Sequence, residues 1–195
     1  MHGLVHKAIQ SFICDTYGVQ AWDAVAASAD NLPLRFEAML SYCDHLTDQV
    51  IDAAARHLGK PRATLLEDVG TYLVSHPNVT APRRLLRFAG STVEEFLHTL
   101  DDLPDRVRLA LPELHLPPIQ LTETGPGAFR VTSGILFDGY GYVLVGLLRA
   151  MSDEYGALTT IEYLGEDAGQ ISIGIGLHDG RFREGRDFRL GAPVA

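Results

Sequence analysis

The sequence has little lysine and no long apolar run. Lysine occurs only at Lys7 and Lys60 among 195 residues, and the formal net charge is -9. A nucleic-acid-binding surface needs clustered lysine and arginine, so we do not expect nucleic acid as a partner. No segment approaches the ~20 apolar residues of a membrane span, and the first residues lack the apolar core of a signal peptide. We therefore expect a cytoplasmic protein without a membrane segment.

Cysteine is also scarce, and the usual catalytic motifs are missing. Cys14 and Cys43 are the only cysteines, which excludes a closely spaced zinc pair and a disulfide framework. The chain has no G-x-S-x-G nucleophile elbow and no G-x-x-x-x-G-K-[ST] phosphate loop. The glycines between 134 and 146 do not match G-x-G-x-x-G. These absences predict that the chain is not an enzyme.

Eight histidines are the main candidates for site chemistry. His2 and His6 stand four residues apart on a predicted helix, but no carboxylate or thiolate is near in sequence, so we expect a surface pair. His76 precedes a proline at a helix end, where a capping role is expected. His98 lies among apolar residues of a helix and is expected to be partly buried. Helix surfaces, a proline-rich loop and a turn account for the others: His45, His57, His115 and His178.

The first half of the sequence has helical periodicity. Apolar residues recur at intervals of three and four, and glycine or proline closes most segments. Thr47 is the expected N-cap of the third helix. The predicted helices cover 3–16, 34–43, 48–58, 62–76, 81–90 and a segment that starts at 92.

The period changes after Pro117 and Pro118. Alternating segments flank a Gly-Pro-Gly turn, a long helical segment follows, and two more alternating segments come next. This order predicts one α+β domain over 1–195. The predicted strands cover 119–124, 129–135, 159–164 and 170–177, with a helix at 140–155 and a short strand at 188–190.

A proline interrupts the helical pattern of FLHTLDDLPDRVRLAL (96–111). Ser91 and Glu94 have the spacing of a capping box for the first part. Pro104 would cost roughly 3 kcal/mol inside a helix but is favourable in a first turn. We expect a second helix or a kink here, with Asp101 or Asp102 as the cap.

Four blocks of the sequence resemble the heme nitric oxide/oxygen-binding (H-NOX) family, which includes the heme domain of soluble guanylate cyclase. They are MHGLVHKAIQSFICDTYG (1–18), the segment 42–74, RRLLRFAGSTVEEFLHTLDDLPDRVRLALPELHLPP (83–118) and YVLVGLLRAMSDEYGA (142–157). The resemblance implies a helical N-terminal lobe (1–60) packed on a C-terminal lobe (61–195) of helices and a four-stranded antiparallel sheet. In the family, heme lies between the lobes.

The resemblance fails at the residues that hold heme. The family pattern FL-x-x-LD-x-x-H carries the axial histidine, and this chain has Pro104 at that position. The family binds the heme propionates with Tyr-x-Ser-x-Arg, whereas residues 131–146 contain no arginine and Ser133 is the only matching hydroxyl. Val143 replaces the distal tyrosine of oxygen-binding members. The candidate cofactor-binding residues are Leu100, Pro104, Ser133, Val143 and Gly146, with His76 and His98 as substitute metal ligands.

Two functions are compatible with this pattern. The first is a heme-free sensory or regulatory domain, with the cavity holding another apolar ligand or filled by Ile135, Leu136 and Phe137. It would act in trans on a signalling protein of the diguanylate cyclase or histidine kinase type, as stand-alone family members do. The alternative is an NO or CO sensor whose heme is held by His98 or His76. Its propionates would be neutralised by Arg83, Arg87 or Arg130.

Overall fold

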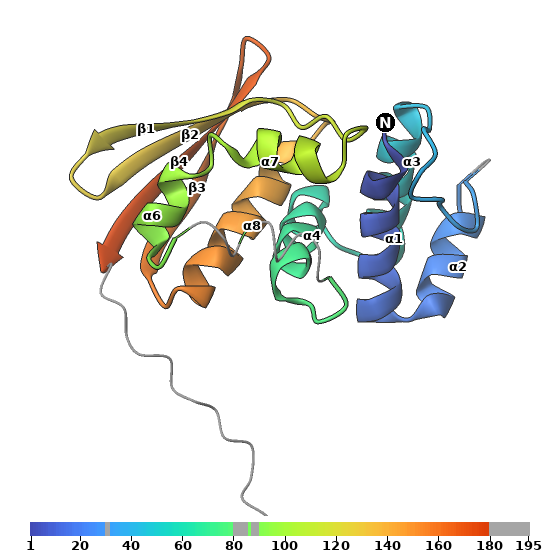
Figure 1. The fold of residues 1–195 in the computed structure, drawn as a ribbon. Coiled ribbons are helices and arrows are strands. Elements are labelled where there is room, and N and C mark those ends of the chain that lie inside the picture. The colour runs from blue at the N-terminus through green and yellow to red at the C-terminus, as the bar shows by residue number, and fades with distance from the viewer. Residues whose placement is uncertain (30–31, 80–85, 87–89, 180–195) are drawn as a thin grey trace, which may run out of the picture.

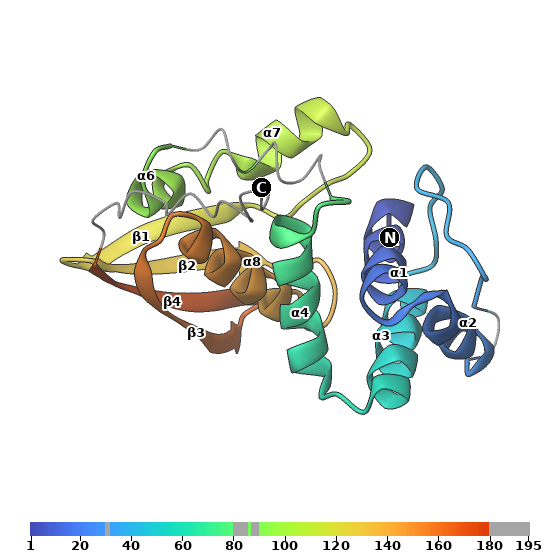
Figure 2. The same ribbon diagram turned by 90° about the horizontal axis from the view of Figure 1, so that it is seen from below.

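Helices form the N-terminal end of the molecule. The computed structural model describes residues 1–29, 32–79, 86 and 90–179. The first three helices are α1 (Gly3–Tyr17), α2 (Val19–Ala27) and α3 (His45–Leu58). They lie together at one end of the molecule, and α4 (Arg62–Ser75) separates them from the rest (Figures 1 and 2). The predicted helices at 3–16, 48–58 and 62–76 are confirmed, while α2 is a helix that the sequence did not predict.

A four-stranded antiparallel sheet forms the other end. Its strands β1 (Ile119–Gly125), β2 (Ala128–Gly134), β3 (Leu158–Asp167) and β4 (Gln170–Asp179) lie in the order β1-β2-β4-β3. The long helix α8 (Tyr140–Glu154) lies across one face of the sheet, and the shorter α6 (Val93–His98) and α7 (Leu103–Ala110) lie beside β1 (Figure 2). The predicted α+β class, four strands and long helix are confirmed.

Two glycines bring α4 and α8 into direct backbone contact. A Cβ added at Gly146 would lie 1.9 Å from the carbonyl oxygen of Glu67, and one at Gly70 would lie 2.1 Å from the carbonyl oxygen of Val143. Both distances are far below van der Waals contact, so no side chain fits at either position without moving a helix. This contact fixes α8 between α4 and the sheet.

The N-terminal helices enclose a buried histidine. His6 of α1 is fully buried, its ring stacks on Phe36 at 4.7 Å between centroids, and its Nε2 lies 3.1 Å from the hydroxyl of Thr47. Burial lowers the pKa of His6 to about 4. The predicted surface pair of His2 and His6 is therefore wrong. The predicted cap at Thr47 is also wrong. Helix α3 begins at His45, and the Thr47 hydroxyl forms a hydrogen bond with His6.

The helix predicted at 34–43 does not form, so that prediction is wrong. Side chains from the first two helices bind the backbone of this segment instead. Gln10 accepts a hydrogen bond from the Phe36 N–H, and both Gln10 and Trp22 donate to the carbonyl of Leu34. These contacts come from residues 12 to 26 positions away in the chain and hold the segment in an irregular path.

The chain breaks between α6 and α7, as Pro104 predicted. Helix α6 ends at His98, and α7 begins at Leu103 with Pro104 in its first turn. Proline is well tolerated there because a first-turn N–H has no helical partner to lose. Asp102 occupies the N-cap position without a side-chain hydrogen bond. The break produces two helices, each buried on one side only.

The capping box of α6 lies one residue later than predicted. The Thr92 hydroxyl accepts from the backbone N–H of Glu95, and the Glu95 carboxylate accepts from both the N–H and the hydroxyl of Ser91. The predicted pair of Ser91 and Glu94 is therefore wrong by one position. The Glu95 carboxylate binds the residue before the N-cap, whereas in the standard capping box it would bind the N–H of the N-cap residue itself.

Some predictions fall on parts of the chain outside the described residues. They are the helix at 81–90 except for Leu86 and Gly90, the strand at 188–190, and the arginines Arg83 and Arg87. The division into lobes at residue 60 falls between α3 and α4 and stays a prediction. Within the described ranges, every helix is too short or too polar to cross a membrane.

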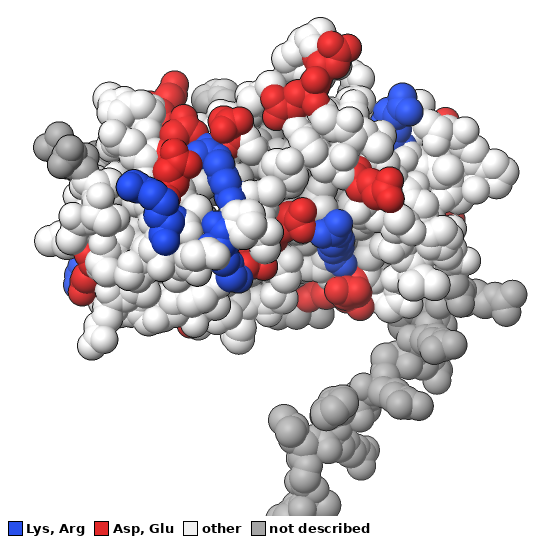
Figure 3. All heavy atoms as spheres, turned by 180° about the vertical axis from the view of Figure 1, so that it is seen from behind, with Lys and Arg blue, Asp and Glu red and all other residues white. Residues whose placement is uncertain are grey.

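Charged side chains of both signs are interspersed on the face shown in Figure 3. Arg62 pairs with Asp48, Asp52 and Asp138, which join α3, α4 and the turn before α8. Arg149 of α8 pairs with Glu67 of α4. Exposed pairs of this kind contribute about 0–1 kcal/mol each, so they guide orientation more than they stabilise the fold.

Candidate functional site

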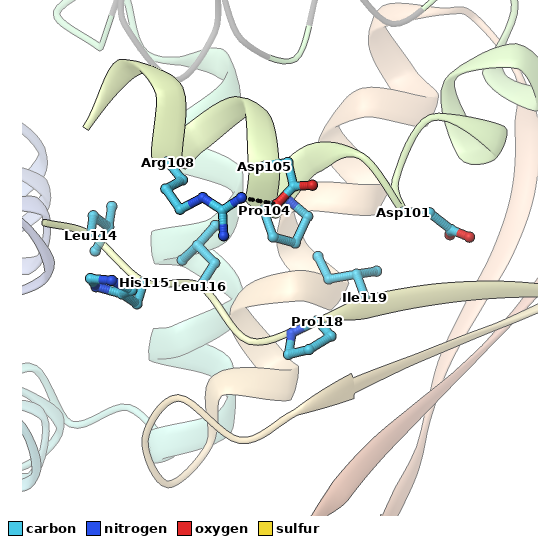
Figure 4. A pocket seen from close by; sticks show the side chains of 9 residues that line it. All are labelled: Asp101, Pro104, Asp105, Arg108, Leu114, His115, Leu116, Pro118 and Ile119. Carbon is cyan, nitrogen blue, oxygen red and sulfur yellow. Dashed lines mark ion pairs between the residues drawn. The ribbon is translucent and has the colours of Figure 1, made fainter. Parts of the chain in front are cut away.

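A hollow lies between α7 and the segment 114–119 that leads into β1 (Figure 4). Its volume is about 290 Å³, and it is open to solvent on one side. Helix α7 turns its buried residues Leu103 and Val107 toward the core, so Pro104 and Arg108 point to the segment instead. The apolar part of the wall consists of Pro104, Leu114, Leu116, Pro118 and Ile119.

The charged side chains around the hollow already have partners. Arg108 and Asp105 form an ion pair with 3.1 Å between the guanidinium nitrogen and the carboxylate oxygen. Asp101, which precedes α7, accepts a hydrogen bond of 2.8 Å from the backbone N–H of Leu121 in β1. The hollow therefore offers an anionic ligand no free arginine in its described lining, while Asp101 keeps its negative charge.

His115 is the histidine that lines this hollow. Its Nδ1 lies 3.1 Å from the carbonyl oxygen of Glu113. Because a carbonyl can only accept, Nδ1 carries the hydrogen in this contact and Nε2 keeps its lone pair. Among the described residues, Nε2 has no hydrogen-bond partner. The sequence predicted the exposure of His115 but not its place at the hollow.

The two predicted metal ligands lie elsewhere. His98 of α6 is half exposed, and its Nε2 lies 3.3 Å from the carboxylate of Glu123 in β1. His76 follows α4, and its ring packs tilted against the ring of Tyr72 with 4.8 Å between centroids. Its Nδ1 lies 3.6 Å from the Asp15 carboxylate. Hydrogen bonds, first from the Tyr72 hydroxyl, hold the pKa of Asp15 below its usual value. His76 and His98 thus contact different elements, and neither lines the hollow.

The other predicted pocket residues are packed into the core. Leu100 is buried, and the Ser133 hydroxyl is buried and donates to the carbonyl of Gly134. Val143 and Gly146 belong to the contact of α8 with α4. Of the predicted set, Pro104 alone lines the hollow within the described part of the chain.

The three side chains that were expected to fill a cavity differ in burial. Leu136 and Phe137 pack partly buried against the hydrophobic core, whereas Ile135 is exposed. Arg130, a predicted propionate partner, is exposed on β2, where successive side chains alternate between faces and Ser133 points inward. Arg130 and Ser133 therefore lie on opposite faces of the sheet.

Comparison with known proteins identifies the family. The profile of the Haem-NO-binding family matches residues 2–163. The chain belongs to this family. Soluble guanylate cyclase 89Da of Drosophila melanogaster is 23% identical over 174 residues, which cover 89% of this chain and 26% of that protein. Soluble guanylate cyclase gcy-31 of Caenorhabditis elegans is 26% identical over 154 residues, which cover 79% and 22%. The chain spans about a quarter of the length of these relatives.

Solved H-NOX structures have the same fold. An H-NOX protein from S. oneidensis in the Fe(II)NO ligation state has a TM-score of 0.76 at 15% identity, over 92% of this chain and 100% of that one. The unliganded Fe(II) H-NOX protein from K. algicida has a TM-score of 0.75 at 13% identity, over 94% and 100%. These similarities confirm the predicted H-NOX fold. Domains of this family are sensor domains that work with signalling partners, rather than catalytic domains.

The residues that the sequence resemblance matches to the family's heme-binding positions lack the groups with which the family holds heme. Pro104 has no donor atom for iron. The region from 131 to 146 has no arginine to pair with propionates, and the Ser133 hydroxyl donates to the carbonyl of Gly134. No group of three or more histidine, cysteine or acidic side chains in the described ranges could hold a metal ion.

The sequence contains a signal for the hollow beyond the apolar periodicity that predicted the helices. Pro104 and Arg108 are four residues apart, which places them on one side of α7, and Asp101 precedes this helix. Pro117 and Pro118 disfavour a helix in the segment before β1. These features indicate a non-helical segment after α7 that contains His115, whereas its path along α7 is known only from the structure.

Proposed function

We propose that this chain is a cytoplasmic H-NOX regulatory domain that works without heme at the family's axial position. The observation that supports the proposal most strongly is Pro104, which lies in the first turn of α7 and forms part of the wall of the hollow. The side chain that would replace a histidine there has no lone pair, and the propionate arginine is missing as well. The proposed regulator responds instead to another apolar ligand.

The hollow is linked to the N-terminal helices through one short segment. The Glu113 carboxylate lies 3.8 Å from Nε2 of His2, whose Nδ1 accepts from the Leu4 N–H and so caps α1. The carbonyl of the same Glu113 binds His115 at the hollow. A change in the hollow that displaces residues 113–116 would act on the start of α1 through this contact.

The proposed partner is a signalling enzyme in trans, a diguanylate cyclase or a histidine kinase. Membership in a family of regulatory domains supports a signalling partner, and the net charge of -9 argues against nucleic acid. We expect the purified chain to change the rate of such an enzyme from the same organism. A Glu113→Gln variant should change that rate less, because it weakens the contact with His2.

An absorption spectrum of protein expressed with heme precursor tests the heme-free state. We expect no Soret band, and only a broad band of loosely adsorbed pigment after hemin is added. A sharp Soret band at stoichiometric heme that shifts with NO would contradict the proposal and establish the gas-sensor alternative. His98→Ala and His76→Ala variants would then show which of the two predicted ligands holds the iron.

A further inference from the structure

We propose that the hollow between α7 and the segment 114–119 binds a small, neutral, mainly apolar molecule that donates one hydrogen bond to Nε2 of His115. An indole or a phenol has this chemistry. The inference rests on the proposed function in one respect, since it assigns the region beside Pro104 to a ligand other than heme. It adds the class of ligand and the residue that recognises it.

The state of His115 determines what it can recognise. The contact with the Glu113 carbonyl favours the tautomer with the hydrogen on Nδ1, and in this tautomer Nε2 accepts a hydrogen bond. A ligand that carries an N–H or O–H group can satisfy this acceptor. A ligand that only accepts hydrogen bonds cannot, because its lone pair would face the lone pair of Nε2.

The charged groups favour a neutral ligand. Arg108 is paired with Asp105, and Asp101 is held by the backbone of β1 at Leu121. An anionic ligand would have to displace Asp105 from Arg108 and would also meet the negative charge of Asp101, and both are costly. A neutral ligand avoids this cost and leaves the existing pairs intact.

The volume and the lining of the hollow indicate the size and the apolar character of the ligand. A volume of about 290 Å³ lies just below the ~300–1,000 Å³ typical of small-molecule pockets, which restricts the hollow to a small ligand. Asp101 lies at one end of the hollow and His115 at the other. The wall between them is apolar and consists of Pro104, Leu116, Pro118 and Ile119. One ring, or two fused rings, would cover this surface while an N–H or O–H at the edge reaches His115.

Titrations with indole and 1-methylindole isolate the proposed hydrogen bond, because the two probes differ at the donor. A net hydrogen bond contributes about 0.5–1.5 kcal/mol, so wild-type protein should bind indole roughly two- to tenfold more tightly. His115→Phe keeps a ring and removes the acceptor, and it should abolish the preference. His98→Ala, which changes a histidine outside the hollow, should retain it. Calorimetry gives the affinities.

Nuclear magnetic resonance provides a direct readout of the same contact. Indole should shift the Nε2 resonance of His115 and the amide resonances of Arg108 and Leu116, whereas 1-methylindole should shift only the amides. The inference is overturned if no saturable shift appears at these residues. It is overturned equally if both probes bind wild type alike, or if His115→Phe retains the preference.

A parallel hemin titration separates this inference from the proposed function. If indole does not bind and hemin gives no sharp Soret band, the ligand class is wrong while the heme-free regulator stands. If hemin gives a sharp Soret band at stoichiometric heme, the proposed function fails, and with it the assignment of the hollow to another ligand.

Discussion

The contact between α4 and α8 and the hollow beside α7 differ in what determines them. In the first, two helix backbones touch through Gly70 and Gly146, and no side chain can be added. In the second, α7 buries only Leu103 and Val107, and Leu109 on its outer side is 85% exposed. The position of α8 on α4 is fixed by direct backbone contact. The position of α7 depends on a few side chains that other apolar residues could replace.

This difference explains how a chain can keep a fold and change its site. Gly70 and Gly146 are both needed for the close approach of α4 and α8, so a larger residue at either position would force the two helices apart. Pro104 sits in the first turn of a short helix, where a proline fits as well as a histidine would. The comparison therefore predicts large effects at the glycine contact and small ones at the hollow.

The largest effect is expected from Gly146→Ala. The new Cβ would lie 1.9 Å from the carbonyl oxygen of Glu67, and a backbone atom cannot move aside as a side chain can. Overpacking in cores typically costs 1–3 kcal/mol, and here we expect about 3 kcal/mol or more. Urea denaturation followed by circular dichroism measures the loss of unfolding free energy.

Gly174→Ala is the matched control for this variant. Gly174 lies in β4, where a Cβ would meet only the side chain of Leu164 at 3.4 Å. We expect a change within about 0.5 kcal/mol. If both variants lost the same unfolding free energy, the α4–α8 contact would be no more sensitive to an added methyl group than β4.

The next effect is a loss of stability in acid through His6. Its pKa is near 4 in the folded protein and 6.5 in the unfolded chain, so the unfolded state takes up the proton first. Stability from this group is complete above pH 6.5, falls as the pH drops below that value, and levels off near pH 4. The loss at the low end is on the order of 2–3 kcal/mol. Urea denaturation at several pH values measures it.

Two variants test this assignment. His6→Phe is expected to flatten the part of the pH dependence between 6.5 and 4, even though it also removes the contact with Thr47. His115→Phe at the exposed hollow should leave that part unchanged. A steep dependence that persists in His6→Phe would assign the acid sensitivity to other groups.

A smaller effect is expected from Thr92→Ala at the start of α6. The hydroxyl of Thr92 accepts from the Glu95 N–H, and α6 has only six residues to share the loss of this cap. Removing such a cap costs about 1 kcal/mol. Glu94→Gln is the control, because Glu94 is one residue away from the observed capping box. An equal loss in both variants would reject the cap at Thr92.

The sequence predicted the regions that are governed by periodic burial. Helices α1, α4 and α8 and the four strands follow apolar patterns that a single element produces by itself. The break at Pro104 was also predictable, because a proline's effect on a helix is local. The membership in the H-NOX family followed from blocks of sequence rather than from any one residue.

The remaining errors come from contacts between distant parts of the chain. The segment 34–43 has the composition of a short helix, but its backbone is bound by Gln10 and Trp22. The sequence predicted a surface position for His6 and a helix cap for Thr47. The two side chains, which are 41 residues apart in the chain, form a hydrogen bond in the core. The hollow needed the path of residues 114–119 along α7, which no local pattern specifies.

The smallest effect is expected from Pro104→Ala at the hollow. A proline at a compatible position stabilises by about 0.4–1 kcal/mol, chiefly because it restricts the unfolded chain, and alanine forfeits this amount. The rest of α7 should persist, since Leu103 and Val107 keep their burial. Urea denaturation gives the loss, and Gly146→Ala measured alongside sets the scale. A loss as large as that of Gly146→Ala would mean that Pro104 supports the fold itself. The hollow would then be constrained like the α4–α8 contact, and the contrast between the two regions would no longer hold.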